Sequence, residues 1–334
     1  MEETKSYFCD ELNNVLSCMN EKIFSCCSGQ SGPVYYEKYK NEKISFDYFY
    51  KIKEHALNIL ASGCIDNLPC KNCFNLREKK ANDEISKTYK WINVSHWTAC
   101  NCGCTYCARM NDSKGVITPK PVKSEYYDFL PLLKQLYKNE LLDRENLTAC
   151  IQGGDISVLK EFKPVVQEFL KNGIKEFHIL TNNITYQPII KDLLDMNKAA
   201  LVTSLDCGTR ETYYKIKRVD KFNDCVNNLR KYAQSPHKDR INVKYILVEN
   251  KNDNIEEITK FIELMSSIGI FVVEFSIDYK YVLFTDLDKT PLPAHYKDLF
   301  IHFKNQCEEK GISLSMWPRV EHIVNNYLLK KEPA

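Results

Sequence analysis

The sequence predicts an α/β fold, a partial (β/α)6 TIM-like barrel with an N-terminal cysteine-containing extension and a helical C-terminal tail. From about residue 90 onward, short apolar segments alternate with amphipathic ones, as strands alternate with crossover helices. Several of the apolar segments carry few polar residues, which is typical of strands buried on both faces of a parallel sheet. An eight-unit barrel needs about 250 residues, whereas only about 190 lie between the start of the first strand and the end of the sixth. Six units therefore fit the chain better than eight.

The predicted strands are segments rich in Val, Ile, Phe and Thr. In chain order they are residues 91–97, 147–152, 176–182, 200–206, 242–250 and 270–278. Joined by crossover helices, such strands form repeated right-handed βαβ units.

The crossover helices are predicted from amphipathic periodicity. They are residues 161–171, 187–197 and 255–267. Pro188 suits the first turn of the second helix, because its missing N–H would have no partner there. Asn254 can cap the start of the third helix, and Gly269 can end it.

We expect three parts along the chain. Residues 1–85 form an N-terminal region with a candidate auxiliary metal knuckle, residues 86–280 form the core domain, and residues 281–334 form a C-terminal tail that packs on the barrel. Helical periodicity appears at 46–60 in the first part and at 294–310 in the last.

The charge balance points away from two classes of partner. Lys and Arg number 46 against 44 Asp and Glu, so neither a nucleic-acid partner nor an anionic membrane is indicated. Apolar residues make up 44% of the chain, which excludes global disorder. No apolar run approaches the roughly 20 residues that cross a bilayer. The first residues do not resemble a signal peptide, so we expect a cytoplasmic protein.

The cysteines carry the strongest functional signal. The chain has 15, and reduced cytoplasmic cysteines at regular spacing are more typical of metal ligands than of disulfides. Cys100, Cys104 and Cys107 stand in C-x3-C-x2-C spacing directly after the first predicted strand. Three thiolates from one loop can hold three irons of a [4Fe–4S] cluster and leave the fourth iron open. The alternative is a zinc site that adds Cys102 to these three.

This loop resembles the signature of the radical S-adenosylmethionine (SAM) superfamily. Tyr106 matches the aromatic residue usually found before the third cysteine. The resemblance covers residues 90–280 and implies a [4Fe–4S] cluster on Cys100, Cys104 and Cys107, with SAM bound at the open iron. It also implies an electron donor such as flavodoxin or ferredoxin.

The second predicted strand ends in Gly153-Gly154-Asp155, which resembles the superfamily's Gly-Gly-Glu motif. In that motif the backbone and the acid bind the amino group of SAM. Glycines allow close backbone approach, and a carboxylate suits an ammonium group. In this chain the shorter Asp replaces Glu.

Polar residues end three further strands. Ser204 and Asp206 close the fourth strand and resemble the ribose motif of the superfamily, while Asn182 and Asn250 follow the third and fifth strands. All four are expected to bind SAM, because the carboxyl ends of barrel strands meet at the ligand-binding face. The run from Ser204 to Lys217 resembles the SLD-type branch that modifies peptides.

A second cysteine group lies upstream. Cys70 and Cys73 form a C-x2-C knuckle, and the nearest further thiols in the sequence are Cys64 and Cys102. We expect either an auxiliary iron–sulfur or zinc site built from these four, or reduced thiols that bind no metal. Only Cys307 lies beyond Cys225, so a C-terminal auxiliary-cluster domain is not indicated.

The resemblance implies reductive cleavage of SAM to methionine and a 5′-deoxyadenosyl radical that abstracts hydrogen from a substrate. The SLD-type run favours a peptide or protein substrate, and a small molecule or a sugar is the alternative. No residue is assigned as catalytic. A cysteine-rich zinc-binding interaction protein is the competing hypothesis, and so is a SAM-binding protein without turnover. Iron, sulfide and 5′-deoxyadenosine formation distinguish them.

Overall fold

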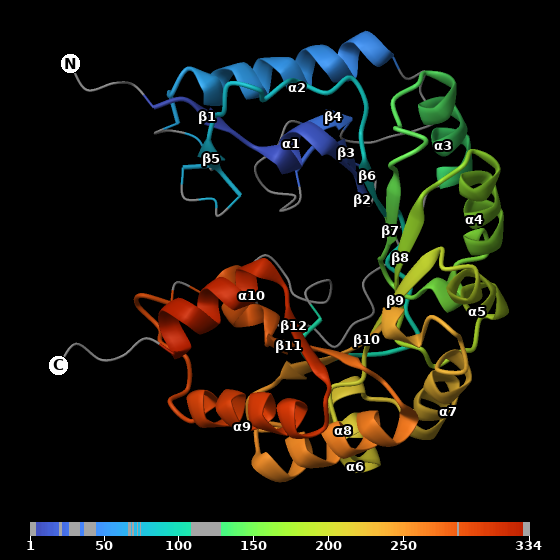
Figure 1. The fold of residues 1–334 in the computed structure, drawn as a ribbon, viewed down its shortest axis with the longest axis vertical. Helices are drawn as coiled ribbons and strands as arrows, with labels where there is room; N and C mark the ends of the chain where they lie inside the picture. Colours follow the sequence, from blue (N-terminus) through green and yellow to red (C-terminus); the bar gives the residue numbers. More distant parts are fainter. Residues whose placement is uncertain are drawn as a thin grey trace. The chain divides into compact units, whose positions relative to one another are not determined.

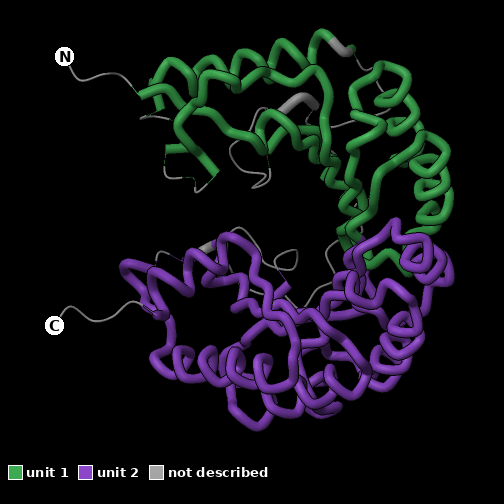
Figure 2. Tube along the Cα trace, in the orientation of Figure 1, with its two compact units in different colours: residues 1–99, 124–178 green, residues 100–123, 179–334 purple. Residues whose placement is uncertain are grey.

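The computed structural model describes residues 5–19, 22–26, 34–36, 45–65, 68, 70–71, 73, 75–107, 128–285 and 287–329. The chain forms two compact units (Figure 2). Unit 1 comprises residues 1–99 and 124–178, and unit 2 comprises residues 100–123 and 179–334. The chain passes from unit 1 to unit 2 directly before the cysteine loop. The three parts expected from the sequence stay a prediction.

Unit 1 is built around parallel strands with a hairpin beside them. Its strands are β1 (Tyr7–Phe8), β2 (Val15–Met19), β3 (Lys22–Phe24), β4 (Val34–Tyr36), β5 (Arg77–Glu78), β6 (Trp91–Ser95) and β7 (Thr148–Ile151). Strand β6 lies between β2 and β7 and is parallel to both. Strands β2, β3 and β4 follow one another antiparallel, and β1 pairs with β5. The predicted third strand is β8 (Glu176–Leu180), and the limit between the units falls within it.

The helices of unit 1 are α1 (Asp10–Asn14), α2 (Phe46–Ala61), α3 (Phe129–Lys138) and α4 (Phe162–Lys171). Figure 1 shows α3 and α4 beside β6 and β7. Aromatic rings join these layers, since Phe129 of α3 stacks on His96 at a centroid distance of 5.2 Å. Phe169 of α4 meets Phe177 of β8 edge to face at 5.8 Å. Such contacts add to the apolar burial that holds the helices on the strands.

Unit 2 continues the alternation of strand and helix. Its strands are β9 (Ala199–Ser204), β10 (Ile241–Leu247), β11 (Val272–Ile277) and β12 (Ser313–Met316). Neighbours in the order β9, β10, β11, β12 are parallel. The helices are α5 (Pro188–Asp195), α6 (Arg210–Lys217), α7 (Phe222–Tyr232), α8 (Ile255–Ile268), α9 (Tyr296–Glu309) and α10 (Pro318–Ile323).

The sequence signals for helix ends are confirmed in unit 2. Pro188 is the first residue of α5. The Asn254 side chain accepts the backbone N–H of Glu257 at 3.0 Å and so caps α8. Gly269 ends α8 with φ at +80°, a conformation that side chains rarely adopt.

Aromatic packing fixes α8 and α9 on the sheet of unit 2. Tyr245 of β10 contacts Phe261 of α8 at a centroid distance of 4.9 Å. The same ring contacts Phe303 of α9 at 5.5 Å. The expected α/β fold with parallel strands is therefore confirmed. Within the described ranges, no helix is long and apolar enough to cross a membrane.

Candidate functional site

The cysteine loop, residues 100–107, is tied to the last turn of helix α6. The backbone N–H of Gly103 donates to the carbonyl of Lys217 at 3.0 Å, and that of Thr105 donates to the carbonyl of Ile216 at 2.9 Å. The final carbonyls of a helix have no partner within the helix. The loop therefore satisfies them, and α6 sets the path of the loop.

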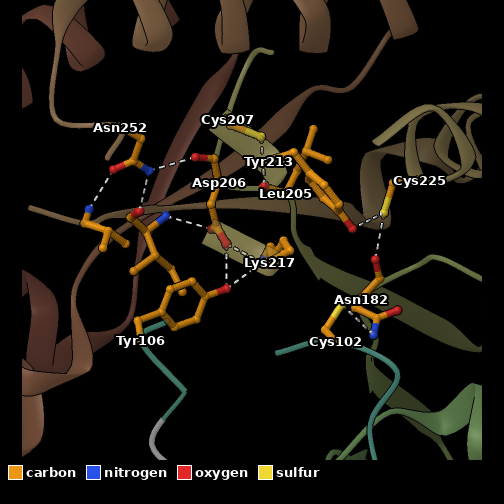
Figure 3. A network of polar contacts seen from close by, with 12 residues as sticks. Cys102, Tyr106, Asn182, Leu205, Asp206, Cys207, Tyr213, Lys217, Cys225 and Asn252 are labelled. Carbon is orange, nitrogen blue, oxygen red and sulfur yellow. Dashed lines mark hydrogen bonds and ion pairs between the residues drawn. The ribbon is translucent and has the colours of Figure 1, made fainter. Parts of the chain in front are cut away.

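A buried network of three side chains anchors the same loop (Figure 3). The Tyr106 hydroxyl donates to the Asp206 carboxylate, and the Lys217 ammonium donates to both. Asp206 and Lys217 expose 0% and 1% of their side chains. The second carboxylate oxygen of Asp206 accepts the backbone N–H of Ile246 at 2.9 Å. This network links the loop, the end of β9 and helix α6.

Lys217 keeps its positive charge in this network. Burial alone would lower the pKa of Lys217, but the Asp206 carboxylate and the Cys104 thiolate outweigh it and raise that pKa. Burial first, and then Asp206, raises the pKa of Tyr106, so this residue stays a hydrogen-bond donor. An ammonium, a carboxylate and a neutral phenol thus meet at the loop.

The loop thiols differ in acidity. A hydrogen bond from Cys102 lowers the pKa of Cys104, burial opposes this, and the Lys217 ammonium lowers it further, to about 6. Hydrogen bonds to Cys100 and Cys104 raise the pKa of the Cys102 thiol. Cys104 is therefore the more acidic of these two thiols, and the thiolate is the form that binds metals. This donor set suits an iron–sulfur cluster.

Asn182, which follows β8, lies at the loop sulfurs. Its side-chain amide donates to the side-chain oxygen of Asn101 and lies 3.6 Å from the Cys100 sulfur and 3.4 Å from the Cys102 sulfur. The Cys225 thiol donates to the backbone oxygen of Asn182 at 2.8 Å (Figure 3). The structure thus brings Asn182 to the loop, with its amide against sulfur atoms.

The sulfur atoms do not yet surround a common point. Across the described ranges, no three Cys, His, Asp or Glu side chains already stand in an arrangement that holds a metal ion. Cys107 is the last described residue before the gap at 108–127.

The motif Gly153-Gly154-Asp155 packs against the segment that leads into the loop. The backbone N–H of Asp155 donates to the carbonyl of Ala99 at 2.8 Å, and Ala99 is bonded to Cys100. A Cβ atom on Gly154 would lie 1.7 Å from that same carbonyl oxygen. Glycine is therefore required at 154 by the close approach of two backbones.

The Asp155 carboxylate is buried and accepts a hydrogen bond from the backbone of its own segment. The residue is 1% exposed, and one carboxylate oxygen accepts the backbone N–H of Ser157 at 2.9 Å. Its backbone carbonyl accepts the indole N–H of Trp97 at 3.0 Å. The motif thereby braces the chain just before the cysteine loop.

Two other predicted residues lie at strand ends. Ser204 is half-buried at the end of β9, where it pairs with Lys244 of β10. Asn250 is exposed in the turn after β10, with φ at +60°.

Sequence reasoning missed Asn252, which is fully buried. Its amide donates to the carbonyls of Asp206 and Ile246 at 2.7 and 2.8 Å, and its side-chain oxygen accepts the N–H of Val248 at 2.7 Å. From the sequence, Lys217 is only the last residue of the run that resembles the SLD-type branch. No sequence pattern marks either residue, because their roles depend on partners from other strands.

The predicted auxiliary cysteines fall in different places. Cys70 and Cys73 form a turn in which the N–H of Cys73 donates to the carbonyl of Cys70 at 2.9 Å. Cys64 is exposed. Cys102 belongs to unit 2, where it shares hydrogen bonds with Cys100 and Cys104. The position of Cys102 is therefore accounted for by the loop itself.

A cavity of about 730 Å³ opens beside the loop in unit 2. Its lining includes Asn101, Tyr186, Tyr214 and Arg218. None of the residues predicted to bind SAM lines it, whereas Tyr214 of α6 and Asp224 and Asn228 of α7 do.

Comparisons with known proteins identify the same family that the spacing of the cysteine loop indicates. A family model described as the Radical SAM superfamily matches residues 94–265. The molybdenum cofactor biosynthesis protein moc-5 of Caenorhabditis elegans is 26% identical over 184 residues, which cover 54% of this chain and 29% of that protein. The GTP 3′,8-cyclase of Haemophilus influenzae is 24% identical over 198 residues, or 57% of this chain and 53% of that enzyme. The matches thus span about half or less of these relatives.

Among solved structures, Streptococcus suis SuiB is similar in fold. It gives a TM-score of 0.51 at 12% identity, covering 84% of this chain and 56% of SuiB. Its complex with the precursor peptide SuiA gives 0.51 at 11% identity, covering 93% and 73%. At such identities the likeness concerns the fold alone.

Proposed function

Because this chain belongs to the radical SAM superfamily, whose model spans residues 94–265, we propose that it cleaves SAM reductively. The superfamily uses a [4Fe–4S] cluster and SAM, and Cys100, Cys104 and Cys107 would hold that cluster. The observation that carries the assignment is the C-x3-C-x2-C loop fixed on the last turn of α6. When bound, the cluster and SAM would supply one-electron cleavage and a hydrogen-abstracting 5′-deoxyadenosyl radical.

Several residues would position the loop without touching SAM. Tyr106, Asp206 and Lys217 are buried and bonded to one another, which supports a positioning role. Asn182 would donate to a cluster sulfur, because its amide already lies against loop thiols. Hydrogen bonds to the sulfurs influence cluster potentials. Cys102 would not be a ligand.

The SAM contacts would come from strand ends. Gly153 and Gly154 would present backbone groups to the amino group of SAM, and Ser204 and Asn250 would add side-chain contacts. Asp155 would act either directly or through a bridging water, since one of its oxygens already caps Ser157. A cytoplasmic setting with a flavodoxin or ferredoxin as donor fits a site built from reduced thiols.

For the substrate we propose a peptide or protein. This is supported by the Ser204 to Lys217 run and by the similarity in fold to SuiB with its bound precursor peptide. A second candidate is a nucleotide or another small molecule, because a curated relative is a GTP 3′,8-cyclase.

The test measures 5′-deoxyadenosine from anaerobically reconstituted protein with SAM and dithionite. Cys100→Ala, Cys104→Ala and Cys107→Ala should each abolish its formation, because the cluster loses a ligand. Cys102→Ala is the matched control and should retain activity. Full activity in any of the first three variants, or equal loss in all four, would refute the ligand assignment.

A deuterium experiment separates the two substrate classes. Uniformly deuterated peptides from the host proteome and deuterated GTP are supplied in parallel, and mass spectrometry follows deuterium in 5′-deoxyadenosine. Transfer from a peptide supports the first candidate, whereas transfer from GTP replaces it with the second.

A further inference from the structure

Unit 1 holds four cysteines, from three segments of the sequence, that come near one another around its N-terminal strands, although no three of these described residues already stand in a metal-holding arrangement. Strand β1 pairs antiparallel with β5 in the register Phe8 to Arg77. Continued by one residue, this register places Cys9 beside Leu76, whose N–H donates to the carbonyl of Cys73 at 3.0 Å. The pairing therefore carries Cys9 to the Cys70–Cys73 turn.

Packing brings the same residues together. Cys9 and Cys70 both lie against one apolar cluster, which is made by Phe8, Leu12, Leu57, Leu60 and Ile65. Cys9 also stands at the start of α1, where its sulfur accepts the N–H of Leu12 at 3.4 Å. The cluster thus packs against cysteines from two separate segments.

Cys26 joins this group from the end of the β2–β3 hairpin. The Ser17 hydroxyl donates to its carbonyl at 3.2 Å. Burial first, and then the negative charges that Cys26 and Cys73 carry when ionised, raise the pKa of both Cys9 and Cys70. The backbone of Cys26 has φ at +145°, which an L-residue adopts only where its surroundings impose it.

The positive charge of Arg77, which lies over the ring of Phe8 in β1, is balanced by carboxylates. The Arg77 guanidinium is paired with Asp10 and Asp83, each at 2.7 Å. Ionised together, four thiolates would repel one another unless a bound cation compensates them. A group of four cysteines that includes a C-x2-C turn matches the ligand sets of structural zinc and of iron–sulfur clusters.

We propose that Cys9, Cys26, Cys70 and Cys73 form a tetrathiolate metal site within unit 1. All four come from turns or element ends, which can close around a metal as it binds. This ligand set replaces Cys64 and Cys102 of the sequence-based expectation with Cys9 and Cys26. The site lies wholly within one unit, so it does not depend on the proposed function.

The experiment uses full-length protein that carries Cys100→Ala, Cys104→Ala and Cys107→Ala, which removes the ligands of the proposed SAM-cleaving cluster. Metal and sulfide are measured after anaerobic purification. About four irons per chain would support a cluster at this site, and about one zinc would support a mononuclear site. A folded protein with neither metal would overturn the proposal.

Single substitutions in that background identify the ligands. Cys9→Ser, Cys26→Ser, Cys70→Ser and Cys73→Ser should each lower the metal content at least severalfold. Cys64→Ser is the matched control, because Cys64 is exposed in the same unit, and it should leave the content unchanged. Retention of metal by Cys9→Ser and Cys26→Ser, or its loss in Cys64→Ser, would overturn the ligand set.

A second measurement tests the proposal even if the substituted variants do not fold. Metal-free background protein is titrated with Co²⁺ alone, and thiolate-to-cobalt charge transfer is followed by absorption. One equivalent should saturate an intense band and raise the melting temperature. Absence of the band from protein with native circular dichroism would refute the proposal without any further variant.

Discussion

Replacing Lys217 by Met tests whether the buried network anchors the cysteine loop. The substitution keeps the length of the side chain and removes its charge, which leaves the Asp206 carboxylate buried without its counter-ion. Removing one partner of a buried ion pair costs about 3–5 kcal/mol, because the remaining charge is desolvated and uncompensated. Tyr106 and the N–H of Ile246 still donate to Asp206, so we expect the lower end of that range.

The assay is urea unfolding of wild-type and variant proteins prepared alike, followed by circular dichroism. The double variant Lys217→Met/Asp206→Asn removes the orphaned charge, and Asn tolerates the positive φ of +66° found at 206. It should recover much of the lost stability, as a coupled pair does in a double-mutant cycle. Arg210→Ala, which breaks an exposed ion pair with Asp220, is the control and should change little.

Two results would refute this reasoning. Lys217→Met could unfold within about 1 kcal/mol of the wild type, which is the range of an exposed pair. Alternatively, the double variant could be no more stable than Lys217→Met. Either would mean that the three side chains do not act as one buried unit.

Two further predictions concern unit 1. Gly154→Ala places a methyl group 1.7 Å from the Ala99 carbonyl oxygen. In urea unfolding, it should lower the free energy of unfolding by more than the ~1–3 kcal/mol of ordinary overpacking. Gly103→Ala, whose Cβ would meet nothing closer than 3.6 Å, is its control, and equal stabilities of the two variants would contradict the clash. Burial lowers the pKa of Lys53 to about 8, so between pH 8 and 10.5 the unfolded chain binds more protons and stability rises with pH, by up to about 3 kcal/mol. Lys53→Met should remove this rise, and parallel pH profiles would show that Lys53 does not cause it.

The strands and helix ends were predictable because local patterns encode them. The apolar segments that became β6 and β11 are nearly continuous, and Asn254 and Gly269 mark the limits of α8 at the predicted positions. Strand β2 was missed because it lies outside the strand–helix alternation and its partner β6 lies more than seventy residues away in sequence. Pairing over such a distance leaves no local periodicity.

The candidate site was predictable where spacing carries the chemistry. The cysteine loop was recognised from spacing alone, whereas the buried roles of Lys217 and Asn252 arise from partners on other strands. Asp206 was expected to contact SAM, but its carboxylate is bonded to Lys217, Tyr106 and the N–H of Ile246. We therefore propose that it positions the loop instead.

The grouping of the N-terminal cysteines also could not be predicted from the sequence. Cys64 was chosen for its nearness in sequence to Cys70, but it is exposed. Cys9 reaches the turn at Cys73 through the β1–β5 pairing, which no spacing rule predicts.

The central claim is that SAM binds to a cluster held by Cys100, Cys104 and Cys107. The most direct measurement is the electron paramagnetic resonance spectrum of the dithionite-reduced protein before and after addition of SAM. The account predicts a SAM-dependent change in the cluster signal of the wild type and of Cys102→Ala, and no such change in Cys107→Ala. A cluster at the N-terminal cysteines would add a signal that SAM leaves unaltered. A wild-type spectrum unaffected by SAM, or a SAM-dependent change that persists in Cys107→Ala, would contradict the account.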